Sequence, residues 1–152
     1  MKNEKPRLTD QDYKFVFERV VRLCLDFVIM KNNQVLLIKR DIEPMKGYWC
    51  LPGGMIRQKE SIDEAAERIL KNELGLKLLS KKVIGYIEFP SEINKDGVHV
   101  HSVSIAFLTT LEEGELKGGD QAHEIEFFKS LPEKIDPRQG KLLKDDWEKL
   151  IV

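Results

Sequence analysis

The residues best suited to chemistry lie in one segment, which begins with a glycine pair and continues into a predicted helix. Gly53 and Gly54 follow a proline, and the backbone of such a loop can approach a diphosphate or a cation closely. Farther along, the segment carries carboxylates at Glu60 and Glu73 and a guanidinium at Arg68. Hard cations such as Mg²⁺ take oxygen ligands and bridge phosphates. The segment therefore predicts a site for a metal ion and a phosphate-containing ligand.

The spacing within this segment resembles the Nudix box, Gx5Ex7REUxEExGU, in which U is an aliphatic residue. Between residues 54 and 76 the matching residues are Gly54, Glu60, Arg68, Leu70, Glu73, Gly75 and Leu76. The resemblance implies a Nudix hydrolase of the α/β (α+β) class, in which a mixed β-sheet lies between helices. It also implies that Glu60 pairs with Arg68 and holds the glycine loop in shape.

The predicted helix departs from the family pattern at two positions. The family has acids where this chain has Ile69 and Asn72, and both positions share a face with Glu73 because an α-helix has 3.6 residues per turn. One carboxylate on that face favours a single metal ion over a cluster of two or three. The chain has therefore either lost catalysis or uses one metal ion and takes its general base from another segment.

One branch of the family, the GDP-mannose mannosyl hydrolases, also lacks acids at these two positions. The chain is similar to that branch over roughly residues 8–128, and the shared segments include Leu25-Asp26-Phe27, Lys39-Arg40, Gly47-Tyr48-Trp49 and Leu51-Pro52-Gly53-Gly54. The branch is understood to displace at the anomeric carbon of the sugar, with inversion, so that GDP leaves as an intact diphosphate. The resemblance therefore implies that the substrate is a nucleotide sugar, with GDP-mannose or a related GDP-hexose as the leading candidate.

The same resemblance assigns roles to individual residues of this chain. The metal ligands that it implies, for Mg²⁺ or Mn²⁺, are the Gly53 carbonyl and Glu73. The catalytic residues are His123 as general base, Arg40 and Arg68. The substrate-binding residues are Asp26, Arg40 and His101, and the residues that hold the box in shape are Gly54, Glu60, Arg68 and Gly75.

Three mismatches with the branch affect substrate specificity. Met55 replaces an arginine, Ser102 replaces a tyrosine, and Ala122 replaces a glutamine that ligates the metal. Gln121 is adjacent to the last of these, but successive side chains of an extended segment point to opposite sides. Arg57 is a candidate for the missing charge near the glycine pair.

Two other functions are compatible with these residues. One is a Nudix pyrophosphohydrolase of another nucleoside diphosphate derivative, which attacks phosphorus and releases a nucleoside monophosphate. The other is a non-catalytic nucleotide-binding module, which the mismatches at Ile69, Asn72 and Ala122 favour and the retained box residues oppose.

The elements that must position these residues alternate between strands and helices, which indicates a layered α/β or α+β fold. The best-marked helix begins at Ser61, where Ser61 and Glu64 form a capping box, and ends at Gly75. The other predicted helices span residues 9–20 and 141–150. The predicted strands span residues 23–30, 34–38, 47–51, 83–89, 98–108 and 124–128, with a turn region at 90–97.

Length and charge limit the classes of partner. The 152 residues predict one domain, 1–152, and the balance of 25 basic and 26 acidic side chains argues against nucleic acid. No run approaches the roughly 18 apolar residues of a membrane helix, and the polar start lacks a signal core, so we expect a cytoplasmic protein without a membrane segment. Cys24 and Cys50 predict buried thiols rather than a disulfide. By resemblance, the N-terminal helix contributes to a homodimer.

Overall fold

The computed structural model describes residues 8–118 and 122–151. Its helices are α1 (Asp10–Phe17), α2 (Ile62–Leu74) and α3 (Pro137–Leu150). Its strands are β1 (Arg22–Lys31), β2 (Gln34–Arg40), β3 (Trp49–Cys50), β4 (Gly53–Met55), β5 (Leu78–Ile93), β6 (His99–Leu111) and β7 (Ala122–Phe128).

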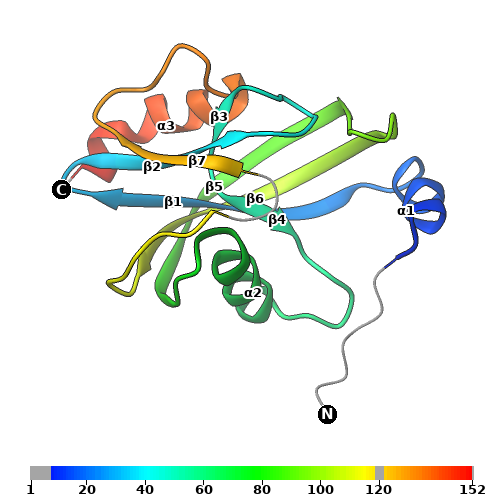
Figure 1. Cartoon of the computed structure of the whole chain (residues 1–152), viewed down its shortest axis with the longest axis horizontal. Coiled ribbons are helices and arrows are strands. Elements are labelled where there is room, and N and C mark those ends of the chain that lie inside the picture. Colours follow the sequence, from blue (N-terminus) through cyan, green and yellow to red (C-terminus); the bar gives the residue numbers. More distant parts are fainter. Residues whose placement is uncertain (1–7, 119–121, 152) are drawn as a thin grey trace.

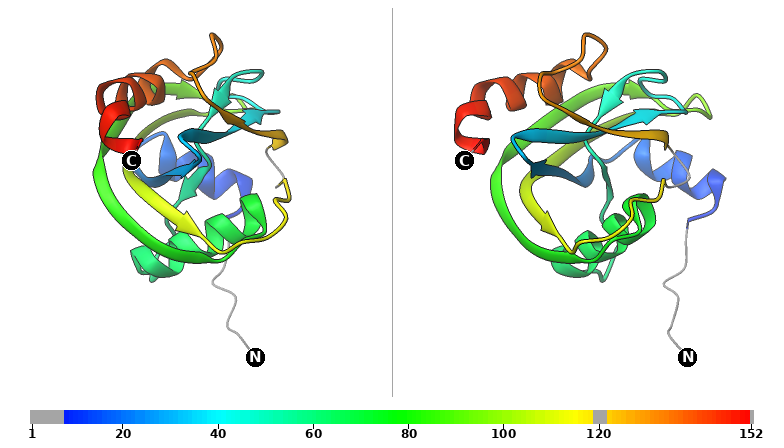
Figure 2. Two further views of the ribbon diagram at one scale, coloured as in Figure 1. Left: turned by 90° about the vertical axis from the view of Figure 1, so that its left-hand side faces the viewer. Right: turned by 60° about the vertical axis from the view of Figure 1, so that its left-hand side comes forward.

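The strands form a mixed sheet, as the sequence predicts. The order is β3-β2-β1-β6-β5, while β4 pairs with β1 and β7 pairs with β2. β1 and β6 run parallel, and the remaining pairs of strands are antiparallel. The long strands β5 and β6 curve around one side of the molecule (Figure 2).

Two helices cover opposite sides of the sheet, α2 below it and α3 above it in Figure 1. Successive side chains of a strand point to opposite faces. On β1, Phe27 accordingly belongs to the core beneath α2, with Leu70 and Leu74, whereas Val28 belongs to the core beneath α3, with Leu143. The structure thus confirms a mixed sheet between helices.

The helix of the predicted box has the expected ends. Ser61 Oγ accepts a hydrogen bond from the Glu64 amide at 3.1 Å, and the Glu64 carboxylate accepts one from the Ser61 amide at 2.7 Å. Gly75 ends the helix in the left-handed region, with φ 73°, which glycine adopts without steric cost. Both helix termini were therefore predictable from local sequence.

Several boundaries differ from the sequence predictions, among them one end each of α1, α3 and β5. α1 ends at Phe17, three residues early, and none of its residues is buried. α3 begins at Pro137, four residues early, because Asp136 caps its first turn. β5 continues through Pro90 to Ile93, where a turn was predicted. A proline is tolerated there because β5 is an edge strand and its register shifts between Phe89 and Glu92.

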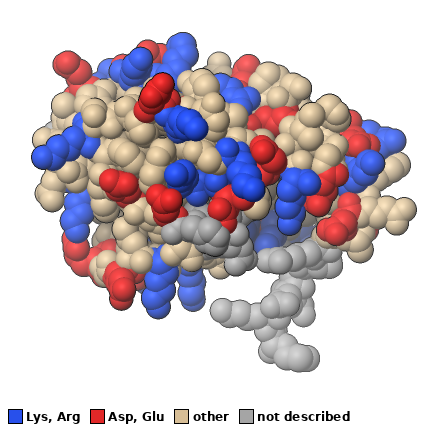
Figure 3. All heavy atoms as spheres, turned by 45° about the horizontal axis from the view of Figure 1, so that its top comes forward, with Lys and Arg blue, Asp and Glu red and all other residues tan. Residues whose placement is uncertain are grey.

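Charged side chains of both signs are interspersed over the face drawn in Figure 3. No helix within the described ranges is long and apolar enough to cross a membrane. Nothing on the drawn face forms the extended basic surface that polyanion binding requires.

Candidate active site

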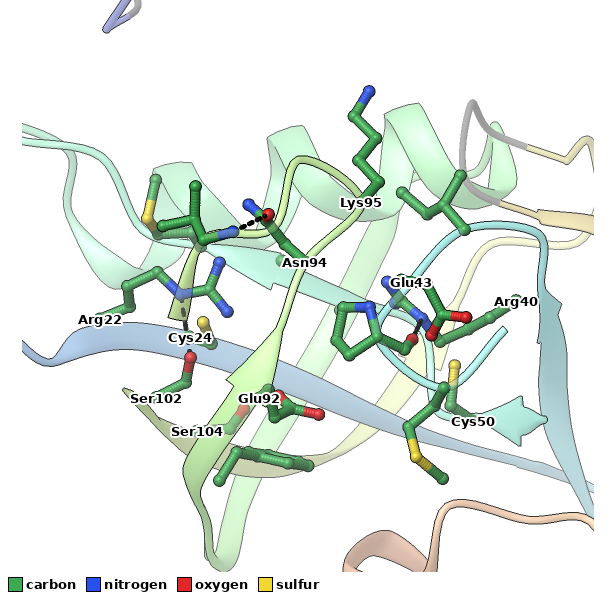
Figure 4. Close-up of a pocket in the computed structure, with 18 of the residues that line it drawn as sticks. Arg22, Cys24, Arg40, Glu43, Cys50, Glu92, Asn94, Lys95, Ser102 and Ser104 are labelled. Atoms are coloured by element: carbon green, nitrogen blue, oxygen red, sulfur yellow. Dashed lines mark hydrogen bonds between the residues drawn. The ribbon is translucent and has the colours of Figure 1, made fainter. Parts of the chain in front are cut away.

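A cavity of about 770 Å³ lies on the face of the sheet opposite α2. Its floor comes from β1, β5 and β6, and its sides come from β4, the β2–β3 connection, the start of α3 and α1. Figure 4 shows Arg22 and Ser102 toward one end and Arg40 and Glu43 toward the other, with Glu92 between them. The cavity has room for a ligand of nucleotide size.

The glycine pair forms part of the cavity wall and fits there because it lacks side chains. Gly53 pairs with Asp26 in the antiparallel register of β4 and β1. A Cβ on Gly53 would lie 2.3 Å from Asp26 Oδ1 and 2.5 Å from the carbonyl oxygen of Leu25. Such distances are not tolerated, so the backbone at residue 53 can take this place only as glycine.

Arg68 and Glu60 hold the loop that follows the glycine pair. Arg68 Nε donates to Glu60 Oε1 at 2.5 Å, and its Nη2 donates to Glu60 Oε2 at 2.9 Å and to the Met55 carbonyl at 2.8 Å. The hydrogen bond from Arg68 is the main reason that the pKa of Glu60 is lowered. Arg68 does not line the cavity, so these contacts give it the loop-holding role.

On the face of α2 that is predicted to bind the metal ion, Glu73 is the residue that retains an acid of the Nudix box. Ile69 is 3% exposed, and its Cγ1 lies 3.2 Å from where a Cβ on Gly54 would be. Asn72 is exposed, whereas the Oε2 atom of Glu73 is buried. Within residues 8–118 and 122–151, no group of three or more His, Cys, Asp or Glu side chains forms a metal site.

The donor set implied by the box suits a hard cation. A backbone carbonyl and a carboxylate, as at Gly53 and Glu73, are oxygen ligands of the kind that Mg²⁺ binds while keeping several waters. Gln121, the candidate for a third ligand, lies outside the described residues. The residues present therefore fit a single Mg²⁺ or Mn²⁺ better than a cluster of ions.

Asp26 lies at the floor of the cavity, 7% exposed. Desolvation by burial raises the pKa of its carboxyl to about 7, although Ser104 and Gln139 lower it. Gln139 Nε2 donates to Asp26 Oδ2 at 3.3 Å, and Gln139 Oε1 accepts from the Leu51 amide at 2.8 Å. The first turn of α3 thus connects Asp26 to the segment that leads into the glycine pair.

Two further acids, Glu92 and Asp136, line the cavity near Asp26. Both interact with the guanidinium of Arg138. Arg138 Nη2 donates to Glu92 Oε2 at 3.0 Å, and Arg138 Nε lies 3.6 Å from Asp136 Oδ1. Burial raises the pKa of Glu92, and the charge of Arg138 opposes this. Sequence analysis identified none of Glu92, Asp136, Arg138 or Gln139, because no local motif marks them.

The remaining substrate-binding predictions have different outcomes. Arg40 lines the cavity, where its Nε donates to the Pro44 carbonyl at 2.6 Å. His101 does not line it. Ser102 and Ser104 face the cavity, and the alternation of β6 turns His101 toward a smaller cavity of about 270 Å³ beside α1.

The predicted general base lies at the start of β7. Ala122 is opposite Arg40 in the register of β7 and β2, so the backbone of His123 runs beside the strand that carries Arg40. The side chain of His123 lies outside the described part of the structure. The role of His123 stays a prediction.

Both cysteines are free, as predicted, and both line the cavity. Cys50 is buried and Cys24 is half-buried. Burial raises the pKa of Cys24 to about 11 and that of Cys50 to about 12. Both thiols are therefore protonated at neutral pH and contribute apolar wall rather than a nucleophile.

Arg22 lines the cavity, but sequence analysis did not identify it as a site residue. Arg22 Nε donates to Ser102 Oγ at 2.9 Å, and its Nη1 donates to the hydroxyl of Tyr13. Arg57, which the sequence suggested as a substitute for the arginine missing at Met55, does not line the cavity. An arginine at the start of a strand has no local signal that distinguishes it from a surface residue.

Comparison with known proteins extends this description. The NUDIX domain model matches residues 22–146. The ADP-ribose pyrophosphatase of Methanocaldococcus jannaschii is 38% identical over 125 residues, which cover 81% of this chain and 71% of that protein. The low-salt glycan biosynthesis protein Agl8 of Haloferax volcanii is 28% identical over 138 residues, 88% of each chain.

Solved structures share the fold. The MutT NUDIX hydrolase of Burkholderia pseudomallei superimposes with a TM-score of 0.73 at 24% identity, over 83% of this chain and 98% of that chain. The MutT protein of Methanosarcina mazei has a TM-score of 0.70 at 18% identity, over 85% and 94% of the two chains.

Proposed function

Because the chain belongs to the Nudix family, we propose that it hydrolyses a nucleotide sugar, GDP-mannose or a related GDP-hexose, with the help of Mg²⁺ or Mn²⁺. Water attacks the anomeric carbon of the sugar, the bond from that carbon to the diphosphate oxygen breaks, and GDP leaves with the electron pair. The products are GDP and free sugar.

The observation that carries this proposal is the environment of Ile69. In the box pattern this position holds an acid, but here the side chain is 3% exposed and packs against Gly54. Glu73 is therefore the only carboxylate that the described helix contributes at the acidic positions of the REUxEE segment. A site with one metal suits a reaction in which the diphosphate is the leaving group, because its charge needs stabilisation but the water needs no second metal.

Several of the predicted site residues have a role in this reaction, and of these Gly53, Asp26 and Arg40 line the cavity whereas Glu73 does not. A divalent cation bound by the Gly53 carbonyl and Glu73 would neutralise charge on the diphosphate. Arg40 provides a guanidinium at the same cavity, and Asp26 accepts hydrogen bonds from the nucleotide. His123 accepts the proton of the attacking water, since its ordinary pKa near 6.5 leaves imidazole neutral at pH 7.

The point of attack is tested by hydrolysis of GDP-mannose in ¹⁸O-labelled water. The proposal predicts GDP without label and mannose that carries ¹⁸O, analysed at once by mass spectrometry because free mannose exchanges its anomeric oxygen. Release of GMP and mannose 1-phosphate contradicts attack at carbon. Calorimetric binding without turnover across a panel of nucleotide sugars would instead support the non-catalytic function.

The metal ligand is tested by Glu73→Gln, with Glu67→Gln as the matched control because Glu67 is exposed on the same helix. We expect Glu73→Gln to abolish metal-dependent turnover and to weaken Mn²⁺ binding measured by calorimetry. The control should retain both. An unchanged rate in Glu73→Gln would show that Glu73 is not a ligand.

A second candidate is pyrophosphohydrolysis at phosphorus, as the name of the ADP-ribose pyrophosphatase that is 38% identical to this chain suggests. This function predicts AMP and ribose 5-phosphate from ADP-ribose. Parallel assays with ADP-ribose and GDP-mannose, scored separately for nucleoside monophosphate and diphosphate, distinguish the two.

The homodimer expected from resemblance has one structural argument in its favour. An eight-residue helix is marginal without tertiary packing, yet α1 has no buried residue and its Phe15 is 61% exposed. We expect a second copy to cover α1. Sedimentation should show a dimer that Phe15→Ser weakens, and a wild-type monomer at all concentrations would exclude it.

A further inference from the structure

Arg22 is a half-buried cation whose hydrogen bonds go to neutral groups. Its Nε donates to Ser102 Oγ at 2.9 Å and its Nη1 to the Tyr13 hydroxyl. No carboxylate of the described residues lies within 4.0 Å of its guanidinium, and its Nη2 donates no hydrogen bond to them. Because charges removed from water are normally paired, a guanidinium held this way suits an anion from outside the chain.

Glu92 and Asp136, two acids that line the same cavity as Arg22, are paired with another cation. Glu92 faces the same cavity, and its charge and that of Arg22 interact. However, the Glu92 carboxylate accepts its hydrogen bond from Arg138, which also lies 3.6 Å from Asp136. The Nζ atom of Lys14, which also lines the cavity, lies 3.9 Å from the Glu18 carboxylate. Among the described residues of the cavity, Arg22 therefore joins Arg40, which donates to the Pro44 carbonyl, as a guanidinium without a carboxylate partner.

The register of the sheet places Arg22 beside the mismatch at Met55. Cys24 pairs with Met55, and Arg22 lies two residues earlier on β1, so its side chain is on the same face. Arg22 also pairs with Ser102 of β6. Ser102 replaces a bulkier tyrosine of the resembling branch, and its hydroxyl accepts the hydrogen bond from Arg22 that Figure 4 draws.

We infer that Arg22, oriented by Ser102 and Tyr13, binds the diphosphate of the substrate and supplies the positive charge that Met55 cannot. The inference rests on the proposed nucleotide-sugar substrate, and it adds a substrate-binding residue from β1 to that site. Arg22 and Arg40 then contact the ligand from opposite ends of the cavity (Figure 4).

The test compares Arg22→Gln with Lys144→Gln, a matched control because Lys144 is exposed on α3, away from the cavity. Calorimetry compares the affinity for GDP with that for guanosine, and the affinity for ADP with that for adenosine. Each difference measures the contribution of the diphosphate to the binding free energy. We expect Arg22→Gln to weaken binding of both diphosphates about 10- to 100-fold, the range of a hydrogen bond to a charged group, and to leave binding of guanosine and adenosine unchanged. Lys144→Gln should bind all four like the wild type.

Kinetics provide the second readout. A contact made equally with substrate and transition state raises KM and leaves kcat unchanged, which is the pattern we expect for Arg22→Gln. Arg22→Lys should restore part of the affinity, and Ser102→Ala should weaken diphosphate binding less than Arg22→Gln does. Equal diphosphate affinities in wild type and folded Arg22→Gln, checked by circular dichroism, would overturn the inference.

Failure of the inference differs from failure of the proposed function. A wild-type protein that binds GDP through Arg22 but hydrolyses no nucleotide sugar contradicts the proposed activity and supports this site. A wild-type protein that hydrolyses GDP-mannose with the same KM as Arg22→Gln supports the activity and contradicts the site. A wild-type protein that binds neither diphosphate overturns both.

Discussion

Gly53 lies directly opposite Asp26 where β4 pairs with β1, and a methyl group on Gly53 would be 2.3 Å from Asp26 Oδ1. The position of the Asp26 carboxylate therefore requires that residue 53 have no side chain. The glycine leaves room for a buried carboxylate, and the carboxylate lies beside the loop that carries a predicted metal ligand.

Gly53→Ala should accordingly destabilise the protein by several kcal/mol, of the order of 2–4, and abolish turnover, because β4 must move away from β1. Gly85→Ala is the control, since a Cβ there would be 3.5 Å from Leu142 Cδ1, an ordinary contact. Urea unfolding measures both. A Gly53→Ala variant as stable as the wild type would show that the loop relaxes without cost.

The pair of Glu60 and Arg68 should matter more than a surface ion pair. Arg68→Met removes hydrogen bonds to Glu60 and to the Met55 carbonyl, and we expect a loss of about 2–3 kcal/mol in the free energy of unfolding. Lys141→Met removes the exposed pair with Asp145 and should leave the free energy of unfolding nearly unchanged, because solvent screens such a pair. Equal losses in the two variants would contradict the loop-holding role of Arg68.

The buried carboxyl of Asp26 predicts a pH-dependent stability. Its pKa is about 7 in the folded protein against an ordinary value of 3.8. The folded state therefore holds a proton that the unfolded state releases as pH rises from 4 to 7, so stability falls across this window. In Asp26→Asn, the decrease in the free energy of unfolding between pH 4 and pH 7 should be smaller than in the wild type by up to about 4 kcal/mol.

The measurement is urea unfolding at several pH values from 4 to 8, for Asp26→Asn and for Asp145→Asn, in which the carboxylate is exposed. Subtracting the curves cancels the other titrating groups. Parallel curves for wild type and Asp26→Asn would exclude a raised pKa at Asp26.

Introducing the acids of the Nudix box at positions 69 and 72 should change the free energy of unfolding by different amounts. Ile69→Glu places a carboxylate in the core beside Gly54, and we expect a loss of at least about 3 kcal/mol. Asn72→Glu adds its charge at an exposed position and should change stability by less than about 0.5 kcal/mol. Unfolding curves that rank the variants in the reverse order would contradict the burial of residue 69.

The sequence alone determined the features that depend on neighbours in the chain. Ser61, Glu64 and Gly75 are enough to define α2, because caps and a left-handed end act within a few residues. The spacing of Glu60 and Arg68 was enough to predict their pairing, and the apolar residues of β1 and β2 predicted a hairpin that the structure contains. Two asparagines, Asn32 and Asn33, adopt the positive φ angles of that turn.

Only the tertiary structure decided which side chains share the cavity. Gln139 lies 113 residues from Asp26 in the sequence and Arg22 lies 80 from Ser102, yet each pair forms a hydrogen bond. Such contacts depend on strand register and on the docking of α3, which no short segment encodes. For the same reason His101, one residue from Ser102, lies on the other face of β6. A side chain that the sequence assigns to the site contributes to it only where the alternation of the strand points that side chain toward the cavity.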